Sequence, residues 1–283
     1  MKVMTTTPFV SGYVFLEGPR WYREHLWVSD IWANKVYAIK QDGRAEVAAE
    51  VPNKPSGLGF LPDGTPLVVS VHDRCVYRVV GSKLEIHADL NDSVNADIND
   101  MVVDTDGRAY VGCMGFDLFS GAEKVPGDII VIDPEGSHRI AASGLDFPNG
   151  MVITNNGRNL VVAESFGARL RVFDKAADGS LSNARTYAEL EGLVPDGICL
   201  DVDGNIWVAG AMGGEFVQVA PNGTVIARID VQPDAASACP LGGVDGRTLY
   251  CLIYAGGIED IKCGKPGARI ETVRVAVAAA GSP

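Results

Sequence analysis

The chain has 283 residues, of which 36 are Asp or Glu and 24 are Lys or Arg, so its formal net charge at pH 7 is −12. This surplus of acid argues against binding to nucleic acid phosphates or to anionic membrane lipids, because both attract basic surfaces. With 47% hydrophobic and 21% charged residues, the chain can bury a large core. No linker rich in Ser, Pro or Gly divides it, so we expect one domain over residues 1–283.

The N-terminal residues 1–7 contain no apolar core of signal-peptide length, and no run approaches the roughly 18 apolar residues of a membrane helix. A cytoplasmic protein is therefore the expectation. Six cysteines lie apart without a Cys-x-x-Cys pair, which favours buried small apolar side chains over a disulfide framework. They are Cys75, Cys113, Cys199, Cys239, Cys251 and Cys263.

A polar turn recurs six times along the chain, at intervals of 39 to 50 residues. The turns fall at Glu24, Asp63, Asp106, Asn156, Asp203 and Asp245. A short run of branched and aromatic residues follows each turn, which is the signal of a β-strand. These runs cover residues 26–28, 67–69, 109–111, 160–162, 206–208 and 249–251, and further runs follow at 36–39, 76–80, 129–132 and 170–173. No long stretch has a 3.6-residue apolar period, so helices are expected to be minor.

Several short strands per unit, repeated about every 45 residues, are typical of a propeller blade. We therefore predict an all-β protein, a six-bladed β-propeller with four-stranded antiparallel blades around a central channel. Residues 269–275 alternate in polarity like an edge strand. We expect them to complete a blade together with residues near the N-terminus and so to close the ring.

Equivalent positions of the repeats converge on the axis of such a ring. The positions seven residues before the turns are Glu17, Ser56, Asn99, Asn149, Asp196 and Ala238. Four of them carry oxygen donors, two carboxylates and two amides, whose charge of −2 would balance a divalent cation. Oxygen ligands suit calcium, magnesium or manganese better than a structural zinc site. The opposing interpretation is that Asn-Gly and Asp-Gly are ordinary turn dipeptides.

The two remaining positions, Ser56 and Ala238, would leave one side of the ring open for a substrate. The four histidines occupy no repeated position, so we expect surface or core side chains rather than metal ligands. They are His25, His72, His87 and His138.

The motifs resemble those of the SMP-30/gluconolactonase (regucalcin-like) family of six-bladed propeller lactonases, over nearly the whole chain. They are Leu16-Glu17-Gly18-Pro19, Pro55-Ser56-Gly57-Leu58, Asn99-Asp100, Pro148-Asn149-Gly150, Pro195-Asp196-Gly197 and Gly242-Gly243. The resemblance implies a small lactone substrate and one divalent metal ion bound by Glu17, Asn149 and Asp196. Calcium is the first choice of metal, with manganese, magnesium, iron(II) or zinc as alternatives. It also implies that Asp196 is the general base and that Asn99 faces the ion or the substrate.

Two departures from the family pattern concern the substrate. Sugar lactonases of the family often have an arginine two residues before the Asn99 equivalent, where this chain has Asp97, and a substrate-contacting glutamate falls near Asp117. The segment 115–121 interrupts the third repeat as a loop that could cover the channel mouth. Its residues Phe116 and Phe119 are expected to line the pocket or form a lid. Met114, Met212 and Trp32 fall near the rim as well, with ordinary packing between blades as the alternative for Met114 and Trp32.

The resulting hypothesis is a metal-dependent lactonase in which Asp196 activates water, acting on a lactone that need not be a sugar lactone. No Gly-x-Ser-x-Gly elbow or cysteine with a recurring histidine partner provides a nucleophile. The alternatives are a phosphotriesterase-type hydrolase, a non-catalytic calcium- or ligand-binding propeller, and a strictosidine-synthase-like propeller. The sequence gives no prediction of the oligomeric state.

Overall fold

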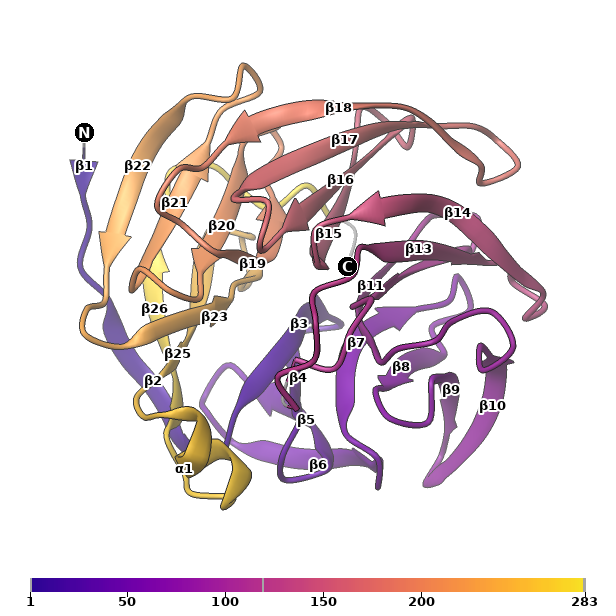
Figure 1. Cartoon of the computed structure of the whole chain (residues 1–283). Coiled ribbons are helices and arrows are strands. Elements are labelled where there is room, and N and C mark those ends of the chain that lie inside the picture. The colour runs from indigo at the N-terminus through magenta and orange to yellow at the C-terminus, as the bar shows by residue number, and fades with distance from the viewer. Residues whose placement is uncertain (1, 119, 282–283) are drawn as a thin grey trace.

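A computed structural model describes residues 2–118 and 120–281. Six antiparallel sheets stand around a common axis like the blades of a propeller (Figure 1). The described residues contain one helix, α1 (Ile258–Lys262), which has five residues. The predicted all-β class, the six-bladed propeller and the minor role of helices are therefore confirmed.

The blades follow one another in chain order, and each contains four consecutive antiparallel strands or their equivalent. Blade 1 contains β3 (Leu16–Tyr22), β4 (His25–Asp30), β5 (Lys35–Lys40) and β6 (Ala45–Glu50); blade 2 contains β7 (Pro55–Phe60), β8 (Pro66–Ser70), β9 (Cys75–Val80) and β10 (Lys83–Asp89). Blade 3 contains β11 (Ile98–Val103), β12 (Ala109–Cys113), β13 (Gly127–Ile132) and β14 (His138–Leu145); blade 4 contains β15 (Pro148–Thr154), β16 (Asn159–Glu164), β17 (Arg169–Lys175) and β18 (Leu181–Glu189). Blade 5 contains β19 (Pro195–Leu200), β20 (Ile206–Gly210), β21 (Glu215–Val219) and β22 (Val225–Asp230), and β1 (Lys2–Val3) adds a fifth, parallel strand to it.

Blade 6 joins the two ends of the chain. It contains β23 (Ala235–Ala238), β25 (Thr248–Tyr254), β26 (Ala268–Arg274) and β2 (Thr7–Tyr13), while β24 (Leu241–Gly242) also pairs with β25. The antiparallel pairing of β2 with β26 confirms that residues near the N-terminus complete this blade. The prediction that residues 269–275 form an edge strand was wrong in one respect. The strand β26 lies between β25 and β2, so β2 is the edge strand.

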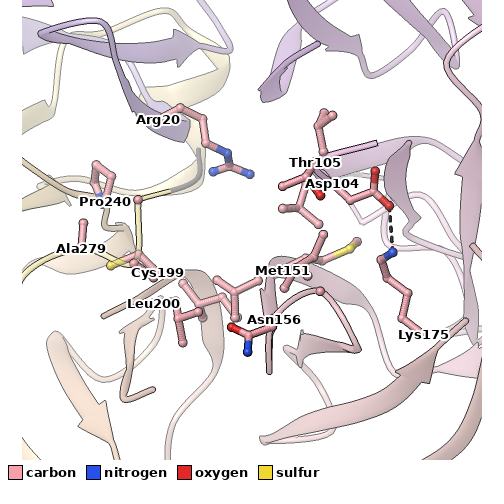
Figure 2. Close-up of a pocket in the computed structure, with 18 of the residues that line it drawn as sticks. Arg20, Asp104, Thr105, Met151, Asn156, Lys175, Cys199, Leu200, Pro240 and Ala279 are labelled. Carbon is pink, nitrogen blue, oxygen red and sulfur yellow. Dashed lines mark ion pairs between the residues drawn. The ribbon is translucent and has the colours of Figure 1, made fainter. Parts of the chain in front are cut away.

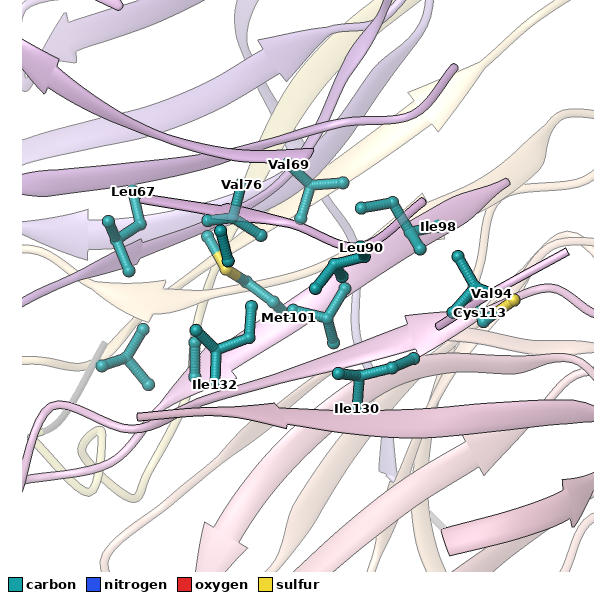
Figure 3. Packing of buried hydrophobic residues seen from close by; sticks show 14 of the residues in the cluster. Leu67, Val69, Val76, Leu90, Val94, Ile98, Met101, Cys113, Ile130 and Ile132 are labelled. Carbon is teal, nitrogen blue, oxygen red and sulfur yellow. The ribbon is translucent and has the colours of Figure 1, made fainter. Parts of the chain in front are cut away.

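The hydrophobic core lies between neighbouring blades. Between blades 2 and 3, for example, Val69, Val76, Ile98 and Met101 interlock from both sheets, and all four are fully shielded from solvent (Figure 3). Their branched or long side chains alternate along the strands with residues of the opposite face. Burial of each such side chain contributes about 1.5–3 kcal/mol, so packing between blades fixes the angle at which each inner strand meets the channel.

The cysteines mostly follow the prediction. Every cysteine of the described chain is a free thiol; Cys75, Cys113, Cys239 and Cys251 are buried and Cys199 is partly buried. Cys263 lies beyond the end of α1 and is exposed, so the prediction of burial was wrong for this residue.

Candidate metal and catalytic site

The first strands of the blades form the wall of the central channel. Strands β3, β7, β11, β15, β19 and β23 each contact the first strand of the next blade, and β23 contacts β3, so the wall closes on itself. One of the six positions that we expected to converge lies near the start of each of the first five strands, and Ala238 is the last residue of β23. We call them the ring positions; they are Glu17, Ser56, Asn99, Asn149, Asp196 and Ala238.

An irregularity in strand pairing occurs at every ring position. The register between first and second strands shifts between Pro55 and Leu58, around Ser56, and between Pro195 and Ile198, around Asp196. Equivalent shifts enclose Asn99 and Asn149, begin at Glu17 and end at Ala238. Such bulges change the direction of a side chain and are frequent beside functional sites. The Asn-Gly and Asp-Gly dipeptides therefore lie within strands, and their interpretation as turns was wrong.

A glycine follows most ring positions because the next inner strand passes very close. A Cβ atom on Gly150 would lie 2.6 Å from the carbonyl oxygen of Asp196 and 2.6 Å from the backbone nitrogen of Ile198. On Gly57 it would lie 2.4 Å from the backbone nitrogen of Met101. Only a residue without a side chain allows this approach, so the glycines bring successive ring positions together.

Hydrogen bonds connect neighbouring ring positions across the blade boundaries. The hydroxyl of Ser56 donates to Oδ1 of Asn99 at 2.8 Å, and Nδ2 of Asn99 donates to Oδ1 of Asn149 at 3.1 Å. Nδ2 of Asn149 donates to the hydroxyl of Ser165 at 3.2 Å, and that hydroxyl donates to the carbonyl of Pro195 at 2.8 Å, directly before Asp196. The structure therefore brings the predicted donors together.

Two buried carboxylates share this end of the channel. Glu17 and Asp196 are each 8% exposed. Burial raises the pKa of Glu17 well above its usual value, and the negative charges of Asp196 and Asp100 raise it further. Burial also raises the pKa of Asp196, with a second contribution from Asp100, while a hydrogen bond from Asn149 opposes the rise. In the described part of the chain, neither carboxylate forms an ion pair with a Lys or Arg side chain.

A third carboxylate of the channel does have a cationic partner. Nη2 of Arg20 lies 3.4 Å from Oδ1 of Asp100, and the same guanidinium donates to the carbonyls of Pro19 and Met101. Burial raises the pKa of Asp100, and Arg20 opposes this effect. Since Arg20 and Asp100 neutralise each other, the charge that remains uncompensated belongs to Glu17 and Asp196. Sequence reasoning missed this pair, which occupies no shared repeat position.

The donor set fits a divalent, oxygen-preferring cation. Two buried carboxylates that repel each other would be balanced by a charge of +2, and the amide oxygens of Asn99 and Asn149 could complete the ligand set. Among the described residues, no three His, Cys, Asp or Glu side chains are grouped so that they could hold a metal ion.

A second set of equivalent residues lies two positions before the ring positions. Their carbonyl oxygens accept a hydrogen bond from the residue after the second strand in five blades. We call them the rim positions; they are Phe15, Lys54, Asp97, Phe147 and Val194. Counting back two residues from each ring position would have found Lys54 and Phe147, which sequence reasoning missed.

The rim is polar over blades 2 and 3. Oδ2 of Asp97 lies 2.7 Å from Nδ1 of His72, which is exposed, and Nζ of Lys54 lies 3.3 Å from the ring centroid of Trp32. Burial lowers the pKa of Lys54, while the charges of Asp97 and Asp117 act in the opposite direction. The predicted residues Asp97, Asp117 and Trp32 thus lie near one cation, Lys54.

The rim is aromatic where blade 4 begins. Phe116 and Phe147 are buried, with ring centroids 5.7 Å apart, and Phe166 packs on both rings at 5.9 and 5.1 Å. Phe166 is 37% exposed, so the cluster presents an apolar edge to solvent. Met114 belongs to the same cluster, as the packing alternative proposed. Sequence reasoning identified Phe116 but missed Phe147 and Phe166.

The other residues predicted near the rim are Asp117, Phe119 and Met212. Asp117 is exposed in the loop between β12 and β13, and its Oδ1 accepts a hydrogen bond from the backbone nitrogen of Ser120 at 3.1 Å. Phe119 lies outside the described residues. Met212 is 70% exposed and belongs to no hydrophobic cluster of the described chain.

A cavity of about 670 Å³ lies at the other end of the channel. Residues further along the inner strands line it, together with the C-terminal residues 279–281 (Figure 2). Its most buried charges are paired: Nζ of Lys175 lies 2.8 Å from Oδ2 of Asp104, and Arg20 pairs with Asp100. The charges at the cavity therefore compensate each other, whereas the unpaired carboxylates of the donor set lie at the opposite end of the channel.

Fold and site together define a six-bladed β-propeller with a buried centre of carboxylate and amide oxygens in its channel. Residues 15–253 match the family model described as SMP-30/Gluconolactonase/LRE-like region. The chain therefore belongs to the SMP-30/gluconolactonase/LRE-like family, as the motifs predicted.

Three proteins illustrate what the chain resembles. It is 29% identical to pentonolactonase XacC of Haloferax volcanii over 271 residues, which cover 93% of this chain and 89% of that protein. It is 28% identical to regucalcin of Xenopus laevis over 175 residues, or 60% of this chain and 58% of that protein, so that match leaves out a large part of regucalcin. The structure of a calcium-binding protein, regucalcin, from Agrobacterium tumefaciens superposes with a TM-score of 0.82 at 21% identity. It covers 99% of this chain and 97% of that protein, and at this identity the likeness concerns the fold.

The described residues include no helix that is both long and apolar enough to cross a membrane.

Proposed function

We propose that this protein is a divalent-metal-dependent lactonase that hydrolyses a small lactone bearing an apolar substituent. The observation that carries the proposal is the buried pair Glu17 and Asp196, which shares one end of the channel with the amides of Asn99 and Asn149. Family membership and similarity to a protein named pentonolactonase support a lactone as the substrate. Similarity to proteins named regucalcin, one of them described as calcium-binding, supports calcium as the first choice of metal.

Each side chain of the centre has a role in this proposal. Glu17, Asn149, Asp196 and Asn99 would hold the ion, with Asn99 able to contact the substrate instead. The bound ion would polarise the lactone carbonyl and stabilise negative charge on its oxygen. Asp196 would accept a proton from the attacking water and return it to the alkoxide that leaves when the ring ester breaks. Asn149 favours the ionised form of Asp196, because its amide lowers the pKa of that carboxyl against the effect of burial.

The rim supports an amphipathic substrate. On one side, Lys54, Asp97 and His72 offer charged and hydrogen-bonding groups, and on the other side Phe147 and Phe166 offer aromatic surface. A lactone with hydroxyl groups all around its ring would leave the aromatic side without a matching partner. We therefore propose an apolar or aromatic substituent on the lactone, with its polar ring toward Lys54 and Asp97.

The closure of the ring by β2 and β26 supports a related proposal, that residues 1–283 form one domain. Every blade contributes a ring position, so removal of any blade would open the channel wall. No part of the chain is then expected to keep the activity alone.

Chelation and metal restoration test the proposed function. Protein stripped with a chelator should lose lactone hydrolysis and regain it with calcium, or with manganese, magnesium, iron(II) or zinc. Asp196→Asn should lower kcat at least 100-fold, because it removes the proton acceptor. Asp245→Asn makes the same chemical change at an exposed ion pair with Arg274 and should keep full activity. Full turnover by stripped protein, or by Asp196→Asn, would overturn the proposal.

Two finer parts of the proposal, the lactone as substrate class and its apolar substituent, are tested by a panel of substrates. A panel should include pentonolactone, aliphatic and aromatic-substituted lactones, and an organophosphate triester for the phosphotriesterase alternative. Phe166→Ala should raise KM several-fold for aromatic-substituted lactones and leave pentonolactone unchanged, while Ile140→Ala, at a similarly exposed apolar position on β14, should change neither. Preference for pentonolactone would contradict the apolar substituent, and turnover of the triester alone would contradict the lactonase.

A further inference from the structure

Two thiols from neighbouring blades meet beside the cavity at the end of the channel opposite the donor set. Sγ of Cys199, in β19 of blade 5, lies 3.9 Å from Sγ of Cys239, which follows β23 of blade 6. The two residues are 40 positions apart in the sequence, so the fold alone brings them together. No other pair among the six cysteines has a sulfur–sulfur contact of this kind in the described chain.

The surroundings of the two thiols differ. Cys199 is partly exposed and lines the cavity together with Leu200, Pro240 and Ala279 (Figure 2). Cys239 is 1% exposed, and its thiol points toward the carbonyl of Gly197 at 4.0 Å. A small reagent in the cavity can therefore reach Cys199, whereas Cys239 is reached only through Cys199.

We propose that Cys199 and Cys239 form a reversible disulfide when a hydroperoxide enters this cavity. The Cys199 thiol loses its proton, and the thiolate attacks one oxygen of the peroxide. The O–O bond breaks, Cys199 becomes a sulfenic acid, and the leaving oxygen takes up the proton from Cys199 to give an alcohol, or water from hydrogen peroxide. The sulfur of Cys239 then attacks the Cys199 sulfur and the S–O bond breaks. The Cys239 proton leaves with the hydroxide as water, so two thiols lose two electrons to one peroxide.

The short distance between the two sulfurs favours formation of a disulfide over a sulfenic acid that stays on Cys199. A disulfide has an S–S length of about 2.05 Å, so the sulfurs must approach by about 1.9 Å, which rotation of the two side chains can supply. Cys251 is fully buried in the same core cluster as Cys239. It does not line the cavity, so the reagent does not reach it first.

The cross-link would join blade 5 to blade 6, the blade that also contains the N-terminal strand β2. Two cavity-lining residues, Cys199 and Pro240, would then be covalently held on either side of the blade boundary. A disulfide that closes a segment of this length restricts the unfolded chain, so the oxidised protein should melt at a higher temperature than the reduced protein.

Peptide mapping tests the proposal, because trypsin separates the cysteines. Cys199 falls in residues 186–228, Cys239 in 229–247 and Cys251 in 248–262. The Cys263→Ser variant, which lacks the exposed thiol that would cross-link separate molecules, is treated with hydrogen peroxide, alkylated after unfolding and digested. We expect peptides 186–228 and 229–247 to be linked, with the loss of two hydrogen atoms, and to separate after dithiothreitol.

Further variants identify the two thiols. Cys239→Ser should leave Cys199 as sulfenic or sulfinic acid, Cys199→Ser should leave Cys239 reduced, and Cys251→Ser should still form the link. The oxidised Cys263→Ser protein should also show the higher melting temperature. The proposal is overturned if both thiols of Cys263→Ser stay reduced, if Cys199 is oxidised without forming a link, or if the link joins Cys239 to Cys251.

Discussion

The hydroxyl of Ser56 donates a hydrogen bond to Oδ1 of Asn99 across the boundary between blades 2 and 3, at 2.8 Å. Ser56 occupies a ring position but was expected only to leave space for a substrate. Its hydrogen bond gives it a second role, because it orients an amide that in turn donates to Oδ1 of Asn149. A serine without a place in the ligand set thus positions two members of it.

We expect Ser56→Ala to weaken binding of the divalent ion about tenfold while the fold is kept, because partners of metal ligands contribute to affinity on this scale. Calorimetric titration of stripped protein with calcium measures the change. Ser70→Ala removes another fully buried hydroxyl from blade 2, one that bonds to Asp73, and serves as the control. Equal calcium affinities for Ser56→Ala and Ser70→Ala would show that the hydrogen bond does not orient Asn99.

The Arg20 and Asp100 pair should determine stability more than activity. Arg20→Met leaves the carboxylate of Asp100 buried and unpaired beside Glu17 and Asp196, which costs about 3 kcal/mol of unfolding free energy. The double variant Arg20→Met, Asp100→Asn removes both charges and should recover most of this loss. Urea denaturation compares the three proteins, and equal stability of the single variant and the unmodified protein would contradict the role of the pair.

The sequence predicted the repeat and the ring positions well, because both follow from local spacing. In blades 1 to 5 a turn follows the end of the inner strand, so a count of seven residues back from it reaches equivalent positions such as Asn149 and Asp196. The strand order of blade 6 was harder to predict. Pairing of β26 with β2 depends on contacts between the two chain ends, which no local pattern records.

The rim could be predicted only in part, since side-chain directions there depend on neighbouring blades. Asp97 was identified by its position, but its partner His72 comes from another blade and was expected to be an ordinary surface or core histidine. Phe166 lies in blade 4 and meets Phe116 of blade 3 only after the blades pack. The cavity at the channel end opposite the donor set was missed for the same reason, because residues 279–281 line it together with inner-strand residues that lie far from them in the sequence.

His87 should make the stability depend on pH. It is 8% exposed, and burial lowers its pKa in the folded protein, with a smaller contribution from Arg78 that Glu135 opposes. The unfolded chain, with an ordinary histidine pKa of about 6.5, then binds the proton more readily. Stability from neutral His87 is therefore present above about pH 6.5 and is lost as the pH falls toward the folded pKa.

Urea denaturation at pH 7.5 and pH 5.5 measures this effect in the unmodified protein and in His87→Gln. The unmodified protein should lose more stability between the two values than the variant, which has no proton to bind at this position. His25→Gln controls for the loss of a partly exposed imidazole. Identical losses in the unmodified protein and His87→Gln would contradict the prediction.

Gly150 shows why the dipeptide Asn149-Gly150 belongs to the site. A Cβ atom there would lie 2.6 Å from backbone atoms of Asp196 and Ile198, so Gly150→Ala must push β15 away from β19. We expect a loss of about 2 kcal/mol in unfolding free energy, typical of overpacking, and a much larger fractional loss of calcium affinity because Asn149 and Asp196 move apart. Gly213→Ala is the matched control, since its Cβ would meet nothing closer than Leu193 Cδ1 at 3.6 Å. If Gly150→Ala binds calcium as tightly as Gly213→Ala does, the close approach of the inner strands does not set the spacing of the donors.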